Sequence, residues 1–117
     1  MFEKDMRLSL LLDYYGDLLS EQRRTIMELY YCEDLSLSEI AENTGITRQA
    51  VRDSIKKGET ELHRLEDALH LADRLAAIAE KCAATAARIE EIAASLPNSE
   101  SKTSLSGLAD EIRTIPN

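Results

Sequence analysis

Several residue types are scarce in this chain of 117 residues, and each scarcity narrows its fold class. Aromatic residues make up 4% of the chain and tryptophan is absent, while there are only 4 glycines and 2 prolines. Sheet-rich proteins favour aromatic residues and need many turns, so this composition argues against them. Hydrophobic residues at 44% and charged residues at 31% are typical of a folded globular chain. We therefore expect an all-α protein with a modest core.

Long apolar runs and metal-type cysteine clusters are missing as well. No segment reaches the roughly 18 consecutive apolar residues of a membrane helix, and the first residues carry mixed charge, unlike a leader peptide. We expect a cytoplasmic protein without membrane insertion. Cys32 and Cys82 lie far apart, which predicts two buried free thiols rather than a disulfide. His63 and His70 lack partners at ligand spacing, so we expect no metal and no cofactor.

Signatures of catalysis are absent too. There is no Gly-rich phosphate loop, no nucleophile elbow and no paired-cysteine motif. Adjacent carboxylates occur, for example the pairs at residues 90–91 and 110–111. Neighbours on a helix point apart, so neither pair can share one substrate atom as a catalytic pair would. The sequence therefore predicts a protein that is not an enzyme.

Charge is distributed unevenly along the chain. The net charge of -8 argues against indiscriminate binding of polyanions. Residues 1–46 are net -6 and residues 58–117 are net -5, whereas residues 47–57 carry four basic side chains against one acidic and are net +3. This basic segment is the part of the chain best suited to contact a polyanion.

Apolar residues at three- and four-residue steps predict two helices before the basic segment. The first runs from about Met6 to Leu19, and the second follows Ser20, whose hydroxyl can cap a helix start, to about Cys32. The tyrosine pairs at residues 14–15 and 30–31 are each expected to bury one ring and expose the other. Stacking of these rings on unpaired bases is the alternative.

A third and a fourth helix are predicted by their end signals. Residues 36–39, Ser-Leu-Ser-Glu, fit a capping box, in which the Ser and Glu side chains each satisfy a backbone amide of the other residue. Gly45 suits the left-handed conformation that ends a short helix, and Thr47 can cap the next one. A small residue, Ala41, permits close approach of the two helices. This segment has the parts of a helix-turn-helix, with Ile40, Ile46, Val51 and Ile55 packed between the helices.

Such packing leaves the start of the fourth helix free to bind nucleic acid. The candidate binding residues are Thr47, Arg48, Gln49, Arg52, Lys56 and Lys57. Arginine and glutamine can read base edges, arginine and lysine can hold phosphates, and a helix N-terminus attracts anions. The alternative is an ordinary solvated helix face, whose basic side chains pair with Asp53, Glu59 and Glu61.

The helical pattern continues beyond the basic segment. A second apolar stripe alternates steps of four and three residues, as in a coiled coil, and predicts a helix that pairs with a partner, most simply in a homodimer. Its candidate contact residues are Leu71, Leu75, Ile78, Cys82, Ile89 and Ile92. Periodicity leaves open whether one helix spans this region or two helices break near Gly58 or His70.

These patterns predict a helix-turn-helix domain at 1–66, a coiled-coil-like helix at 67–96 and a flexible polar tail at 97–117. Within that tail we expect at most one helical turn, near Leu105 to Ile112.

Residues 36–51, Ser-Leu-Ser-Glu-Ile-Ala-Glu-Asn-Thr-Gly-Ile-Thr-Arg-Gln-Ala-Val, resemble region four of bacterial sigma factors. A longer stretch at 7–66 resembles the YlxM family, through Leu-Leu-Leu-Asp-Tyr-Tyr at 10–15, Asp-Leu-Ser-Leu at 34–37 and the helix Arg-Gln-Ala-Val-Arg-Asp-Ser-Ile-Lys-Lys at 48–57. The resemblance implies an accessory role in the signal recognition particle pathway, with contact to its small RNA or its GTPases. Arg52 stands where a Tyr is expected, and the stretch from Leu71 onward fits the family less well.

Three functions therefore remain open. The first is a regulator accessory to the signal recognition particle, and the second is a sigma-like transcription regulator that reads duplex DNA. The third is a helical protein-interaction module in which the coiled-coil stripe binds and the helix-turn-helix is a scaffold. Fold alone does not separate them.

Overall fold

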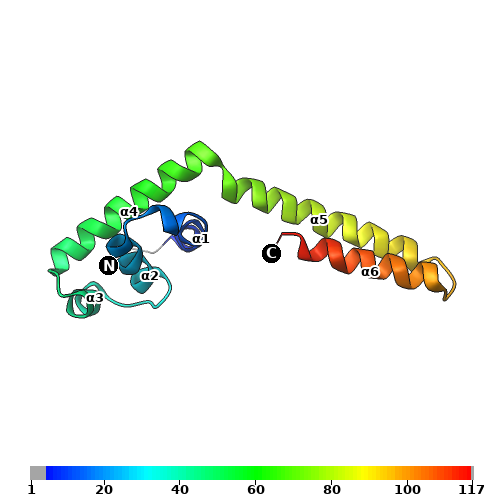
Figure 1. Cartoon of the computed structure of the whole chain (residues 1–117), viewed down its shortest axis with the longest axis horizontal. Helices are drawn as coiled ribbons and strands as arrows, with labels where there is room; N and C mark the ends of the chain where they lie inside the picture. Colours follow the sequence, from blue (N-terminus) through cyan, green and yellow to red (C-terminus); the bar gives the residue numbers. More distant parts are fainter. Residues whose placement is uncertain (1–4, 117) are drawn as a thin grey trace. The chain divides into compact units, whose positions relative to one another are not determined.

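The computed structural model describes residues 5–116, which form helices joined by short connections without any strand (Figure 1). The elements are α1 (Met6–Tyr15), the 3-10 turn η1 (Gly16–Leu18), α2 (Glu21–Tyr31), α3 (Leu37–Thr44), α4 (Arg48–Leu69), α5 (Leu71–Ala94) and α6 (Glu100–Thr114). The all-α prediction is confirmed. The chain divides between Ala72 and Asp73 into two units, here called the first unit and the second unit.

Three helices of the first unit begin where their capping residues predicted. Ser20, Ser36 and Thr47 each accept a hydrogen bond from the backbone N–H three residues further on, at 3.3, 3.1 and 3.0 Å. The capping box is complete, because the Glu39 carboxylate also accepts from the Ser36 backbone N–H at 3.1 Å. These bonds satisfy amides that have no partner inside the helix.

The turn between α3 and α4 depends on a glycine. Gly45 has φ +76°, and its N–H donates to the Ala41 carbonyl at 2.9 Å, which ends α3. A side chain at this backbone conformation would be strained. The next residue, Ile46, packs half-buried against the core. The turn therefore fixes α3 and α4 in the helix-turn-helix arrangement.

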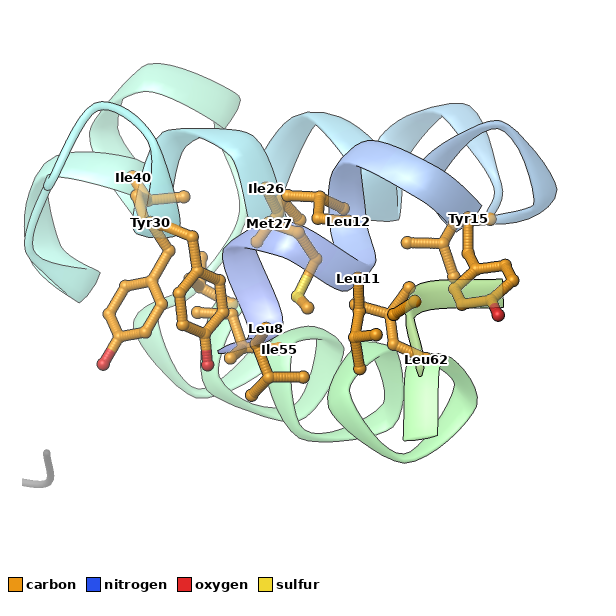
Figure 2. Close-up of a cluster of buried hydrophobic side chains, with 14 residues drawn as sticks. Leu8, Leu11, Leu12, Tyr15, Ile26, Met27, Tyr30, Ile40, Ile55 and Leu62 are labelled. Atoms are coloured by element: carbon orange, nitrogen blue, oxygen red, sulfur yellow. The ribbon is translucent and has the colours of Figure 1, made fainter. Parts of the chain in front are cut away.

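Large apolar side chains from α1, α2 and α3 pack against α4 (Figure 2). Those with essentially no exposed surface include Leu8, Leu11, Tyr15, Ile26, Met27, Ile40, Val51, Ile55 and Leu62. Gly58 lets α4 approach α2 closely, because a Cβ at this position would lie 2.8 Å from the Met27 sulfur. The core therefore holds the long helix α4 in one rotational setting, and this decides which of its residues face outward.

The first predicted helix is shorter than its apolar pattern suggested. Helix α1 ends at Tyr15, and the chain then makes the 3-10 turn η1 before Leu19 becomes extended at φ -82° and ψ 159°. Leu19 donates its N–H to the Gly16 carbonyl at 3.1 Å, while Leu18 is 60% exposed instead of facing inward. The chain must turn here to reach the Ser20 cap, and apolar spacing alone does not register such a turn.

Two predictions about single side chains need correction. Tyr15 is buried and Tyr14 exposed, as predicted, but both rings of the second pair, Tyr30 and Tyr31, are buried edge to face with centroids 5.0 Å apart. An edge-to-face pair fills core volume that one ring would leave open. Both cysteines are free, yet Cys32 is exposed, since it follows the last turn of α2.

Helix α4 continues through Gly58 and ends at Leu69, where His70 takes a left-handed conformation with φ +55°. The break therefore lies near His70. The buried carboxylate of Glu66 accepts hydrogen bonds from the Tyr15 hydroxyl at 2.6 Å and from the Ala72 N–H at 3.0 Å. The bond to Ala72 satisfies a free amide just beyond the break.

The second unit is a helical hairpin made of α5 and α6. The prediction of a flexible tail at 97–117 is wrong for most of its length, because Glu100–Thr114 is helical and Ser99 caps its first turn. Arg113 of α6 donates to the carboxylate of Glu90 of α5 at 3.3 Å, which joins the two helices. The serines and threonines of α6 are typical of a linker, although the apolar positions among them recur at helical spacing.

Candidate nucleic-acid interface

The candidate binding residues lie along the outer face of α4. Arg48, Gln49, Arg52, Lys56 and Lys57 are all exposed. Their place follows from the core, because Val51, Ile55 and Leu62 turn the opposite face of the helix inward. The sixth candidate, Thr47, uses its hydroxyl to cap α4 and so positions the helix start.

The basic side chains of this face are free of internal partners. Within residues 5–116, Arg48, Arg52, Lys56 and Lys57 make neither an ion pair nor a side-chain hydrogen bond. A solvated face stabilised by salt bridges would have paired them with nearby carboxylates. The positive charge of α4 is therefore available to an anionic partner.

The three acidic residues proposed as neutralising partners have other contacts. Asp53 accepts from the Gln49 amide at 3.0 Å, and Glu61 lies 3.8 Å from the Arg23 guanidinium. Burial raises the pKa of Tyr31 above its ordinary range, and the negative charge of the nearby Glu59 carboxylate raises that pKa further. Each carboxylate thus interacts with a group other than the free cations of α4.

A shallow hollow lies where α3 meets the start of α4. It is lined by Leu37, Arg48, Gln49 and Arg52. This is where a helix-turn-helix presents side chains to base edges or phosphates. Since Asp53 holds the Gln49 amide, Gln49 must release this bond before it can read a base.

Besides this hollow, a basic groove lies between α2 and α4 and contains residues that the sequence analysis did not identify. It is lined by Arg23, Lys56, Lys57, Thr60, Glu61 and Arg64. Arg23 also donates to the Ser54 hydroxyl at 3.4 Å, which fixes its side chain toward α4. Arg64 follows Lys57 by seven residues, so helical spacing could have found it. Arg23 comes from another helix and only packing brings it here. The basic surface therefore extends along α4 beyond the helix-turn-helix.

The candidate partner helix is only partly buried. Leu71, Ile78 and Ile92 of α5 are exposed, whereas Leu75, Cys82 and Ile89 are half-buried. The fully buried positions of the second unit are instead the alanines Ala86, Ala93 and Ala109. The apolar stripe of the sequence thus combines residues at the contact between α5 and α6, here called the seam, with residues that face outward.

Among residues 5–116, no helix is both long enough and apolar enough to cross a membrane.

Comparison with known proteins places this chain in a family. Proteins named UPF0122 match the chain: one from Clostridium kluyveri is 54% identical over 69 residues, which cover 59% of this chain and 62% of that protein. One from Desulforamulus reducens is 50% identical over 68 residues, or 58% of each chain, and one from Bacillus thuringiensis is 49% identical over 71 residues, or 61% of this chain and 64% of that protein. The aligned part therefore spans less than two thirds of these relatives' length. Residues 2–103 match the family described as "Putative helix-turn-helix protein, YlxM / p13 like", and the chain belongs to this family, UPF0122.

Proposed function

We propose that this protein is a non-enzymatic nucleic-acid-binding regulator that acts as an accessory to the signal recognition particle. The link to that pathway is what the resemblance to the YlxM family implies, and membership of a helix-turn-helix family supports the binding role. The single observation that carries the binding role is the row of free cations on α4, namely Arg48, Arg52 and Lys56. The natural ligand is the particle's small RNA, and its GTPases are the alternative partners within the pathway.

The charge distribution favours selective over general binding. The chain is net -8, and the four basic residues of 47–57 stand between two acidic segments. A polyanion is repelled from the acidic parts of this surface and attracted to the basic face of α4. Binding should therefore require a particular orientation of the nucleic acid against this helix.

A second function is favoured by the hollow between α3 and α4. A recognition helix whose first turn is exposed fits the major groove of duplex DNA, where Arg and Gln read base edges. The chain would then be a sigma-like transcription regulator. The RNA function predicts binding to folded or single-stranded RNA, whereas this function predicts binding to duplex DNA.

A titration with two ligands separates these functions. Fluorescence anisotropy of labelled signal recognition RNA and of random duplex DNA would be measured at low and at physiological salt. We expect RNA binding that weakens with salt, since each phosphate contact releases counterions. Selective duplex binding would favour the transcription regulator. Binding to neither ligand would contradict both functions and leave the protein-interaction module.

Matched variants assign the binding surface. Arg48→Gln with Arg52→Gln should weaken binding and lower the salt slope by about 1 for each phosphate that the protein no longer holds. Arg24→Gln is the control, because Arg24 already pairs with Asp17 at 2.6 Å and with Glu28 at 2.9 Å. Equal losses of binding free energy for each positive charge removed, in the control and in the double variant, would mean that net charge, not this face of α4, governs binding.

A further inference from the structure

The hairpin of the second unit leaves one side apolar and uncovered. Its exposed large hydrophobic residues are Ile78, Ile92, Leu108 and Ile115, at 45%, 54%, 49% and 62% exposure. Such residues are common when scattered singly, but contiguous apolar surface marks an interaction site. What matters is therefore whether these four residues share one side of the hairpin.

The spacing of each exposed hydrophobic residue from the buried seam shows on which side of its helix it lies. On α5, Ile78 and Ile92 each come one residue before an alanine of the seam, at 79 and 93. On α6, Leu108 comes one residue before the buried Ala109, and Ile115 lies one heptad further on. One residue is about 100° of helical rotation, so all four side chains turn away from their seam in the same rotational sense.

In an antiparallel pair of helices, the same rotational sense on both helices points to the same side of the pair. The ion pair of the hairpin provides a check. Glu90 and Arg113 each come four residues after a fully buried alanine, Ala86 and Ala109, which is a rotation in the opposite sense, and their side chains meet at 3.3 Å. The four exposed hydrophobic residues therefore lie together on the side away from this ion pair, and we call them the apolar flank.

Charged residues border the apolar flank in a complementary pattern. On α5 the border is basic and consists of Arg74, Lys81 and Arg88, spaced seven residues apart. On α6 the border is acidic and consists of Glu100 and Glu111, which are eleven residues, or about three turns, apart. None of these five side chains makes an ion pair within residues 5–116. One flank thus carries an apolar centre, a basic edge and an acidic edge.

We propose that the apolar flank binds a second copy of this chain, with α5 of each copy over α6 of the other. A twofold axis parallel to the helices then places the basic edge of each copy against the acidic edge of its partner, at both edges at once. Placing α5 over the partner's α5 would instead bring like charges together, which is unfavourable. The result is a four-helix bundle in which every neighbouring pair is antiparallel. This proposal is independent of the nucleic-acid function.

Sedimentation equilibrium of the full chain tests the association itself. We expect a mass of twice 13.1 kDa for the native chain. Ile92→Glu with Leu108→Glu should raise the dissociation constant by roughly a hundredfold, because charges would be buried without partners. Ala87→Glu is the matched control, since Ala87 is exposed and follows the buried Ala86 on the opposite side. A native chain that stays monomeric, or a flank variant that dimerises as the control does, would overturn the proposal.

Charge exchange tests the arrangement within the dimer and does not depend on apolar substitutions. One variant carries Lys81→Glu with Arg88→Glu, and the other carries Glu100→Arg with Glu111→Arg. Each variant alone should self-associate less tightly by roughly tenfold, or about 1.4 kcal/mol. Mixed together they should pair as tightly as the native chain, because both edges of the mixed dimer carry opposite charges. Far-UV circular dichroism confirms that each variant is helical. A mixture no tighter than its components would overturn the arrangement of α5 over α6.

Discussion

The two units of this chain are both helical, yet each unit is stabilised internally by a different kind of packing. The first unit buries Leu, Ile, Met and Tyr side chains from four helices, whereas the fully buried side chains of the second unit are alanines at 86, 93 and 109. Burial of a Leu or Ile side chain contributes about 1.5–3 kcal/mol, and a single methyl contributes much less. Helical content alone is therefore a poor guide to local stability. The helices of the hairpin depend on helix propensity and on the Ser99 cap, and the Glu90–Arg113 ion pair joins them.

The largest expected effect comes from shortening one core side chain in each unit. Leu62→Ala should destabilise the first unit by about 2–5 kcal/mol, because it leaves a cavity among fully buried neighbours. Ala86→Gly should cost about 1 kcal/mol, chiefly through helix propensity. Urea unfolding followed by far-UV circular dichroism measures both. Equal losses of stability would show that the two units are packed alike.

The next effect concerns the buried carboxylate at the end of α4. Glu66→Leu should cost about 1–3 kcal/mol, since the Tyr15 hydroxyl and the Ala72 N–H both lose their acceptor in a buried place. Thermal unfolding measures this loss. Glu61→Leu is the control, because Glu61 is only partly buried and its contact to Arg23 is long, at 3.8 Å. Similar losses for both variants would mean that Glu66 is no more important than a surface carboxylate.

A smaller difference is expected between the two units when a helix cap is removed. Ser36→Ala and Ser99→Ala each remove a capping hydroxyl, and each should cost about 1 kcal/mol. In the first unit the tertiary core still holds α3, so its amide protection should change little. In the hairpin the loss should appear as faster hydrogen exchange in the first turns of α6. If both helices respond alike, then local capping matters equally in the two units.

The smallest effect on stability at neutral pH is expected from the tyrosine hydroxyls, which all lie in the first unit. Burial raises the pKa of Tyr30 and of Tyr31 above the ordinary value of about 10. Below pH 10 the folded and unfolded chains are both protonated at these hydroxyls. Above it the unfolded chain loses the protons first, so the stability of the first unit should fall as pH rises beyond 10.

Tyr31→Phe tests the source of that pH dependence. The variant should flatten the decline in unfolding free energy between pH 8 and about pH 11, measured by urea titration. Tyr14→Phe is the control, because the Tyr14 ring is exposed. A decline that is unchanged by Tyr31→Phe would assign the alkaline sensitivity to another group.

Much of the first unit was predictable because its signals are local. A Ser or Thr cap needs only the amide three residues away, and Gly45 needs only its own left-handed backbone. The outward face of α4 was also predictable, since helical geometry places Arg48 and Arg52 opposite the apolar stripe. The predictions that failed depend on more distant parts of the chain. The turn at Gly16 and the burial of both Tyr30 and Tyr31 are decided by how helices pack.

The candidate site shows the same division. Helical spacing found the basic residues of α4, and it could have included Arg64. It could not find Arg23, which comes from α2 and reaches the groove only because Gly58 allows α2 and α4 to lie so close. Nor could it tell whether the cations of α4 pair with neighbouring acids, because several rotamers satisfy the same spacing.

By itself the sequence determined the helical class, the positions of the caps, the helix-turn-helix and the basic segment at 47–57. Each follows from interactions within one or two helical turns, where spacing fixes geometry. Only the tertiary structure decided that the long helix breaks at His70, that 100–114 forms a helix, and that the alanines at 86, 93 and 109 are the buried positions of the hairpin. These features depend on which helices pack against each other. Contacts between helices that are far apart in the sequence leave no periodic pattern from which they could be predicted.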